Sequence, residues 1–411
     1  MKGSYDLDPQ QSYLRYTVQY NSTTATDNIA VDHCGACFIN RLDIFHSSNL
    51  LETVQTYNLL YNYLIDFQFT PSGKQGLSSI YGTGKGTTDF RKGLQLFGNA
   101  TAANAQRLTF TMPLLSGTVG LGADKFVPIG ALSDDIRLEF TFEANDAAVC
   151  YVSGTNGTWT ITNAELELQI IELSDEGQSM VESVTPFSQP VFLHGNSWRH
   201  YVSTLASGTT GGYSYLVPAR FASLKSLVCL PRKSSETTAK AYYSLSSRIN
   251  PNIATYWWRI GAYIIPNKYI TLYNTNNTGG YAEGYMEVVK SFHSLNAPQY
   301  ASGIPMDYYN VQDAATDGTV GGGTSSTAGG VVQTTSTGSS SYQQAFAIAQ
   351  ELESFSNRSD ILISGMNTLA SQVFFEGNIG STGPTSAYTL DFYANYDQII
   401  ILENGIMSAK F

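Results

Sequence analysis

Short runs in which apolar and polar side chains alternate recur along this chain, and they restrict its fold more than any other feature. The clearest run is IRLEFTFE at residues 136–143, in which every second side chain is apolar. Alternation with a period of two is typical of a strand that buries one face. Similar runs lie at residues 13–20, 37–45, 108–115, 159–173, 224–230, 257–265, 388–393 and 399–402.

The segments between these runs are rich in Gly, Ser, Thr, Asn and Pro, which favour turns. Aromatic residues make up 12% of the chain and are common in strands. Many short strands separated by turn residues indicate β-sandwiches or β-barrels. We therefore predict a mainly all-β protein.

Three segments have apolar residues at helical spacing, and each predicts a short amphipathic helix that lies on a core. They are residues 49–67, 281–295 and 341–355. In the first, Asn49 can cap the start of the helix and Glu52 follows three residues later, as in a capping box.

The chain is long enough for two or three domains, and its layout predicts two. A polar stretch at residues 173–179 closes a first strand-rich half, and we place the boundary near residue 183. The predicted domains are residues 1–183 and 184–411. A Gly/Ser/Thr tract at about residues 317–341 cannot bury enough apolar surface to fold alone, so we expect a long surface loop or an interface arm.

Charged residues are scarce, at 13% of the chain against about 25% in typical soluble proteins. Such a chain either covers its surface with small polar residues or hides surface against partners. The net charge is −11 and there is no basic run, so we expect no direct sequence-specific binding of nucleic acid. No apolar run approaches the roughly 20 residues that span a bilayer, and residues 1–11 lack the apolar core of a signal peptide. We expect a protein that is not inserted in a membrane.

One C-x-x-C motif, Cys34 and Cys37 preceded by His33, could take part in metal binding or redox chemistry. A zinc site needs two further ligands, and Cys150 and Cys229 are isolated in the sequence. Small buried thiols at the start of a strand are the favoured interpretation. The sequence does not decide whether Cys34 and Cys37 bind a metal ion.

The glycine-rich segment at residues 82–88 resembles a phosphate-binding loop only superficially. A P-loop needs G-x-x-x-x-G-K-[ST], but Lys85 is followed by Gly86 and position 79 is a serine. We expect a loop between strands.

No catalytic constellation can be assigned. Glu165 and Glu167 share one face of a predicted strand, and we expect that face to be solvated. The five histidines, at positions 33, 46, 194, 200 and 293, are scattered and form no recognisable Ser–His–Asp arrangement. We predict no catalytic residues, no cofactor and no metal site, and therefore not an enzyme.

Residues 38–52 read FINRLDIFHSSNLLE and are followed by YNLLY at residues 57–61. They resemble a strand and helix of the first jelly roll in double jelly-roll major capsid proteins of icosahedral DNA viruses. The segment FVPIGAL at residues 126–132, before the strand at 136–143, is similar to a strand pair of that family. Further similar segments are WRIG at 258–261 with residues 263–270, and residues 396–405.

The resemblance is nearest to polinton-like viruses and virophages. It implies two tandem eight-stranded jelly-roll β-sandwiches with a few short amphipathic helices. It also implies a major capsid protein of the virion that forms homotrimeric, pseudo-hexameric capsomers tiling an icosahedral shell. Its partners would be copies of itself, together with minor capsid, penton and cement proteins.

Two other functions remain open on the residues alone. A surface or secreted β-sandwich could bind carbohydrate through exposed Tyr and Trp side chains, and it would be a monomer. A jelly-roll glycoside hydrolase would need paired carboxylates in a groove, for which Glu165 and Glu167 are the candidates.

Overall fold

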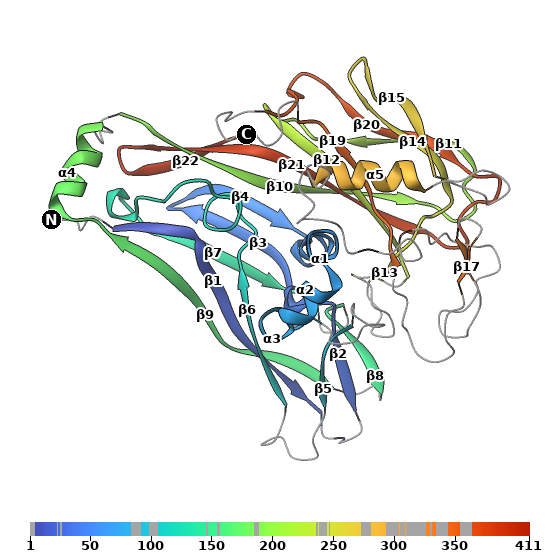
Figure 1. Cartoon of the computed structure of the whole chain (residues 1–411), viewed down its shortest axis with the longest axis horizontal. Coiled ribbons are helices and arrows are strands. Elements are labelled where there is room, and N and C mark those ends of the chain that lie inside the picture. Colours follow the sequence, from blue (N-terminus) through green and yellow to red (C-terminus); the bar gives the residue numbers. More distant parts are fainter. Residues whose placement is uncertain are drawn as a thin grey trace.

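The strands of the chain form two halves that lie side by side (Figure 1). The computed structural model describes residues 5–22, 24, 27–83, 92–97, 106–144, 147–153, 157–184, 189–235, 237, 245, 247–272, 281–292, 304, 309, 326–328, 331–333, 344–353 and 364–411. We call residues 1–183 the first half and residues 184–411 the second half.

The described residues of the first half form nine strands in three antiparallel sheets, with the orders β6-β1-β9, β4-β3-β7 and β5-β2-β8. The first and last of these strands, β1 and β9, pair along most of their length, from Tyr5 opposite Glu172 to Asn21 opposite Thr158. The strands are β1 (Tyr5–Asn21), β2 (Asn28–Asp32), β3 (Ile39–His46), β4 (Asn49–Gln55), β5 (Lys92–Phe97), β6 (Arg107–Pro113), β7 (Ile136–Phe142), β8 (Val149–Ser153) and β9 (Thr158–Glu172).

The second half is a sandwich of two sheets, with the orders β10-β21-β12-β19 and β11-β20-β14-β15, and β22 pairs with β21. Trp258, Phe375 and Phe392 pack between the two sheets. Successive strands divide between the sheets, as in a jelly roll. The strands are β10 (Val191–Leu205), β11 (Gly211–Val217), β12 (Leu224–Lys233), β14 (Ile253–Ile260), β15 (Tyr263–Thr271), β19 (Ile348–Glu351), β20 (Val373–Ile379), β21 (Tyr388–Glu403) and β22 (Ile406–Lys410).

Short helices fill the space around the sheets. Helix α1 is buried on almost every side, including its polar stripe of Asn58, Asn62 and Asp66. It meets the end of α5 through the stacked rings of Phe67 and Phe292, whose centroids are 5.8 Å apart. The helices are α1 (Tyr57–Gln68), α2 (Pro71–Gly76), α3 (Ser78–Tyr81), α4 (Asp175–Val184) and α5 (Ala282–Ser291).

The helix predicted over residues 49–67 is correct only from Tyr57 onward. Residues 49–55 form strand β4, and Thr56, with φ of 47°, turns the chain between strand and helix. Asn49 does not cap a helix; its Nδ2 donates to the carbonyl of Met407. The alternation expected of a strand is missing because β4 is buried on both faces from Leu51 to Val54.

The helix predicted over residues 341–355 is wrong. Two short strands occupy its described part, β18 (Gln344–Ala345) and β19. Wherever side chains are described in residues 344–350, they are buried, so the run has no solvated face. Because it has no polar positions at regular spacing, periodicity cannot distinguish such a strand from a helix. The helix predicted over residues 281–295 is confirmed for α5, and residues 293–295 lie outside the described residues.

In the described part of the chain, the strand pairs of the named sheets stay within one half. The predicted boundary at residue 183 falls in the last turn of α4, which connects β9 to β10. Of the Gly/Ser/Thr tract, only β16 (Ser326–Ala328) and its partner β17 (Val331–Gln333) are described. The expected loop or arm otherwise lies outside the described residues.

Candidate assembly interface

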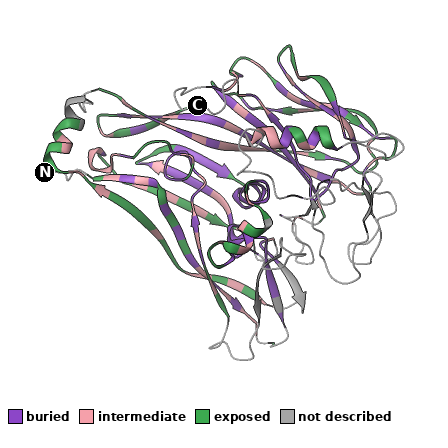
Figure 2. Ribbon diagram, in the orientation of Figure 1, coloured by how far each residue is buried: buried purple, intermediate pink, exposed green. Residues whose placement is uncertain are grey.

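The long strands of the second half extend beyond its own sandwich and lie over the first half (Figure 1). There β10 and β22 contact β4, the edge strand of the sheet β4-β3-β7. Gln398 Nε2 donates to the carbonyl of Leu51 at 2.9 Å, and the backbone N–H of Met407 donates to His46 Nδ1 at 3.2 Å. Figure 2 shows the middle of β4 buried here, while buried and more exposed residues alternate along β10. We call the part of β10, β21 and β22 that lies over β4 the second-half overhang.

A buried carboxylate ties the second-half overhang to the first half. Glu52, on β4, accepts hydrogen bonds from Ser116 Oγ at 2.6 Å, the Gly117 N–H at 3.0 Å and Thr118 Oγ1 at 3.0 Å. Ser197, on β10, donates a fourth. Because three donors come from the first half and one from the second, the Glu52 carboxylate has all four partners only when the halves are joined.

A second buried group of charges joins the halves beneath α1. Arg248 Nη2 of the second half lies 2.6 Å from Asp66 Oδ2 of α1. The other oxygen, Asp66 Oδ1, is 3.0 Å from Lys74 Nζ and 2.8 Å from His33 Nε2. All four side chains are fully buried. Removing one member of such a cluster leaves a buried charge without its partner, which is costly.

The two backbones also approach closely. Gly195 forms an isolated bridge with Ala123 of the first half, and the Asn196 N–H donates to the Gly122 carbonyl at 2.7 Å. A Cβ atom on Gly195 would lie 2.1 Å from the carbonyl oxygen of Gly117. The contact therefore requires glycine at position 195.

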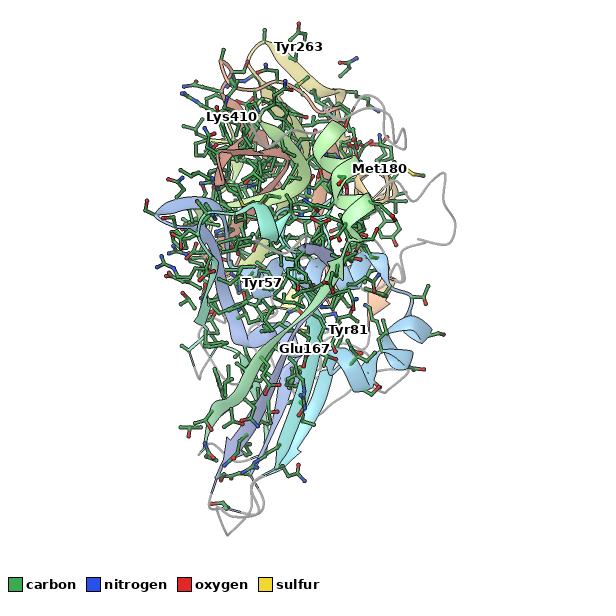
Figure 3. The ribbon with its side chains drawn as sticks, turned by 90° about the vertical axis from the view of Figure 1, so that its left-hand side faces the viewer. Tyr57, Tyr81, Glu167, Met180, Tyr263 and Lys410 are labelled. Atoms are coloured by element: carbon green, nitrogen blue, oxygen red, sulfur yellow. The ribbon has the colours of Figure 1, made fainter. Side chains whose placement is uncertain are left out.

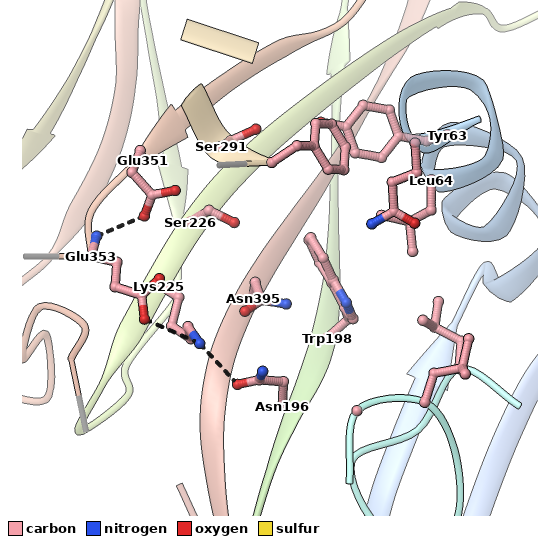
Figure 4. A pocket seen from close by; sticks show the side chains of 15 residues that line it. Tyr63, Leu64, Asn196, Trp198, Lys225, Ser226, Ser291, Glu351, Glu353 and Asn395 are labelled. Atoms are coloured by element: carbon pink, nitrogen blue, oxygen red, sulfur yellow. Dashed lines mark hydrogen bonds and ion pairs between the residues drawn. The ribbon is translucent and has the colours of Figure 1, made fainter. Parts of the chain in front are cut away.

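A cleft of about 280 Å³ lies where the halves meet (Figure 4). One wall is apolar and includes Trp198 and Phe292. The other carries Lys225, whose Nζ lies 3.2 Å from Glu353 Oε1 and 3.2 Å from Asn196 Oδ1. Lys225 and Glu353 thus form an ion pair, and Glu351 on the same wall accepts hydrogen bonds from the backbone N–H groups of Leu352 and Glu353.

His194 links the first half to β21. Its Nδ1 lies 2.7 Å from Asp124 Oδ2 of the first half, and its Nε2 lies 3.5 Å from Asp397 Oδ1. Hydrogen bonds to Asp124 and then Asp397 raise the pKa of His194 from 6.5 to about 9. The imidazolium between two carboxylates is therefore the stable form at neutral pH.

This raised pKa makes the junction sensitive to alkaline pH. A histidine whose folded pKa is raised contributes its full stability below its unfolded pKa of 6.5 and loses it as the pH rises through about 9. We expect the difference in unfolding midpoint between the wild type and His194→Gln to be largest below pH 6.5 and to shrink above pH 9. Urea unfolding across this range measures it, and a difference independent of pH would contradict the assignment.

Thr56, His200 and Asp391 are the nearest approach to a catalytic triad. Thr56 Oγ1 is 3.4 Å from His200 Nδ1, and His200 Nε2 is 2.8 Å from Asp391 Oδ1. Arg232 Nη2 also binds Asp391, at 2.8 Å. Desolvation alone would raise the pKa of Asp391, but Arg232 and His200 outweigh it and lower the pKa. None of these residues lines the cleft, so the arrangement serves to join the start of α1 to β10 and β21.

The two carboxylates considered for a hydrolase lie on the surface of the first half. Glu165 and Glu167 are exposed on β9, as expected, and Glu167 is visible on the surface in Figure 3. Glu165 Oε2 pairs with Arg15 Nη1 at 3.1 Å. Neither glutamate lines the cleft described above.

The C-x-x-C motif lies in the core. Cys34 and Cys37 are fully buried around a short 3₁₀-helix (Gly35–Phe38), and Cys34 Sγ donates to Asn62 Oδ1 at 2.9 Å. Desolvation raises the thiol pKa of both cysteines far above its usual value, which disfavours the thiolate that metals and redox partners need. Among the described residues, no three His, Cys, Asp or Glu side chains gather as a metal site would require.

Other sequence candidates are only partly described. Gly82 and Thr83 follow α3, and residues 84–88 of the suspected phosphate loop lie outside the described residues. The side chain of Cys150 and all of His293 lie outside them too. No helix in the described part of the chain is long and apolar enough to cross a membrane.

Exposed apolar side chains are concentrated on particular strands rather than in a cavity. Contiguous exposed apolar surface in a folded protein marks sites of interaction. On described strands they are Tyr5, Tyr13, Leu168 and Ile170 of β1 and β9, Leu50 of β4, Phe142 of β7, Phe192 and Val202 of β10, Leu216 of β11, Tyr263, Ile264 and Tyr269 of β15, and Ile406 of β22.

Comparison with known proteins identifies the fold by structural similarity. No protein-family profile matches the chain, and no curated protein matches it by sequence. PBCV-1 VP54, as fitted into a cryo-EM reconstruction of the virophage Sputnik, matches with a TM-score of 0.56 and 10% identity, over 100% of this chain and 90% of that chain. The cryo-EM structure of the Sputnik virophage gives a TM-score of 0.56 and 10% identity, over 99% of this chain and 83% of that chain. The Faustovirus major capsid protein matches with a TM-score of 0.51 and 8% identity, over 97% of this chain and 85% of that chain.

These matches extend over both halves of the chain. The fold is that of the double jelly-roll capsid proteins, and the fold class predicted from the sequence is confirmed. Because the sequence identity is 10% or less, this similarity shows the fold alone.

Proposed function

We propose that this protein is the major capsid protein of an icosahedral virus and is located in the virion. In this proposal it forms homotrimeric, pseudo-hexameric capsomers that tile the shell. The observation that carries the proposal is the likeness to viral capsid proteins along nearly the whole chain. Its partners would be copies of itself, with minor capsid, penton and cement proteins.

The surface chemistry supports an architectural function. The chain has few charged residues, and exposed apolar side chains lie along β1, β9, β11 and β15. Subunit interfaces have few charged residues and many aromatic ones at their centre. We further propose that residues 1–183 and 184–411 are the two jelly-roll domains, because strand pairing in the described sheets respects that division.

The two alternative functions have less support. A carbohydrate-binding face needs accessible aromatic rings; Tyr263 and Tyr269 on β15 are exposed, but none of the four tryptophans is, and neither tyrosine lines the cleft. A glycoside hydrolase needs two carboxylates facing each other across a groove, whereas Glu165 and Glu167 are exposed on one strand. The described residues thus favour neither.

Light scattering coupled to size-exclusion chromatography tests the proposal directly. We expect the purified chain to have about three times its monomer mass of 44.7 kDa. Negative-stain electron microscopy of that fraction should show hexagonal particles. A monomer that persists at high protein concentration would contradict the capsid function.

A further inference from the structure

The two halves repeat one local arrangement. In the first half, hairpin β3–β4 turns through two residues, beginning with Ser47 at φ of 53°, and α1 follows. In the second half, hairpin β14–β15 turns through two residues, beginning with Gly261 at φ of 58°, and α5 is the next helix described. The inner strand of each hairpin pairs with a later strand, β7 or β20. Strand β15 is therefore the counterpart of β4.

The counterparts differ sharply in exposure. Strand β4 is buried because the second-half overhang of the same chain covers it. On β15, which no overhang covers, Tyr263 is 70% exposed and Tyr269 is 53% exposed. Figure 3 shows Tyr263 at the outer tip of the molecule. The second half thus presents, uncovered, the edge strand that the first half has covered.

The long strand pairs β10–β21 and β1–β9 differ in exposure in the opposite sense, since here it is the second half that is covered. In the second-half overhang, the face turned toward β4 includes Leu193, Gln398 and Ile400, and these side chains are buried. The equivalent end of the β1–β9 pair extends beyond β6 and carries Leu168 and Ile170, which are 46% and 47% exposed. We call residues 5–8 and 168–172 the first-half overhang. Its β1 edge meets Val127 through an isolated bridge at Leu7, and among the described residues no strand lies beneath Leu168 and Ile170 as β4 lies beneath the second-half overhang.

We propose that the first-half overhang of one copy covers strand β15 of a second copy, as the second-half overhang covers β4 within each chain. The proposal rests on the proposed function, because it names the surfaces that would build the capsomer. It accounts for both uncovered surfaces with one contact. Ile170 and Leu168 of one copy would pack against Tyr263 and Ile264 of the next.

Such a contact joins two different surfaces and is therefore head-to-tail. Repeated head-to-tail contacts close into a ring when the rotation between copies allows it. In that ring the halves would alternate, and every overhang would cover the edge strand of its neighbour. A ring of three copies would contain three contacts within chains and three between chains.

Single charges placed on either surface test the proposal. We expect Ile170→Lys and Tyr263→Lys each to reduce the mass in solution from three chains to one, because each buries an unpaired charge in the contact. Phe192→Lys is the matched control. Phe192 is 63% exposed on the second-half overhang but on the face turned away from β4, so this variant should remain trimeric. Circular dichroism and the thermal midpoint of each variant show whether the monomer is folded.

Mixing the two variants gives a sharper result. Ile170→Lys keeps an intact β15, and Tyr263→Lys keeps an intact first-half overhang. An equimolar mixture should therefore form a one-to-one dimer, with a mass twice that of the monomer, while each variant alone stays monomeric. If each variant alone formed a dimer, or if the mixture showed no association, the head-to-tail contact would be wrong.

The outcomes separate this inference from the proposed function. If the wild type is a trimer and both lysine variants remain trimeric, the contact is wrong and the capsid function stands. If the wild type is a monomer, both are overturned. Cysteine variants confirm the pairing: Ile170→Cys mixed with Tyr263→Cys should be joined by a short bismaleimide, and neither alone should cross-link to itself. Failure of the mixed pair to cross-link within wild-type-sized trimers would contradict the contact.

Discussion

Replacing Arg248 by methionine should lower the free energy of unfolding by about 3–5 kcal/mol, the range for breaking a buried ion pair. Methionine keeps most of the volume but removes the guanidinium group that lies 2.6 Å from Asp66. Lys74 and His33 would still contact Asp66, but the oxygen now bound by Arg248 would lose that partner. Chemical denaturation followed by tryptophan fluorescence measures the change.

Arg137→Met provides the control for this prediction. Arg137 pairs with Glu139 at 3.1 Å, but both side chains are more than half exposed. Exposed ion pairs contribute about 0–1 kcal/mol, so this variant should unfold almost like the wild type. Equal losses for Arg248→Met and Arg137→Met would show that the buried cluster does not hold the halves together.

Gly195→Val should lower the free energy of unfolding by about 3 kcal/mol, at the upper end of the usual range for overpacking. The first added carbon would lie 2.1 Å from the Gly117 carbonyl oxygen, and backbone cannot move aside as a flexible side chain can. We also expect the separated halves to become sensitive to protease. Limited proteolysis of the native protein measures this second effect.

Gly212→Val tests the same substitution where space is available. Gly212 lies on β11 of the second half, and the nearest atom to an added Cβ is 3.7 Å away. This variant should retain the stability and protease resistance of the wild type. If it is as damaging as Gly195→Val, the loss reflects valine in a strand and not the approach of the two halves.

The sequence predicted the strands that have one solvated face. Residues 136–143 and 159–173 alternate clearly, and they correspond to β7 and β9. It failed where strands are buried on both sides, at β4 and β19, because a run without a polar face carries no period of two. It also missed α4, whose polar first turn at Asp175 and Glu176 resembled a connecting loop.

The junction between the halves was beyond reach of the sequence alone. Asp66 and Arg248 are 182 residues apart, and Glu52 and Ser197 are 145 apart. No local spacing links such pairs, because their proximity is produced by the packing of one half on the other. The grouping of His200 with Thr56 and Asp391 was out of reach for the same reason, because the three residues are far apart in the sequence.

The hydrogen bond from Asn49 to Met407 spans 358 residues, and this separation has a consequence for biosynthesis. While the ribosome is still translating the second half, β4 has already emerged and its outer edge is exposed to solvent without its cover. The nascent chain therefore has an open strand edge for most of its translation, and such edges recruit other chains. A chaperone that shields β4 during this interval would raise the yield of native protein.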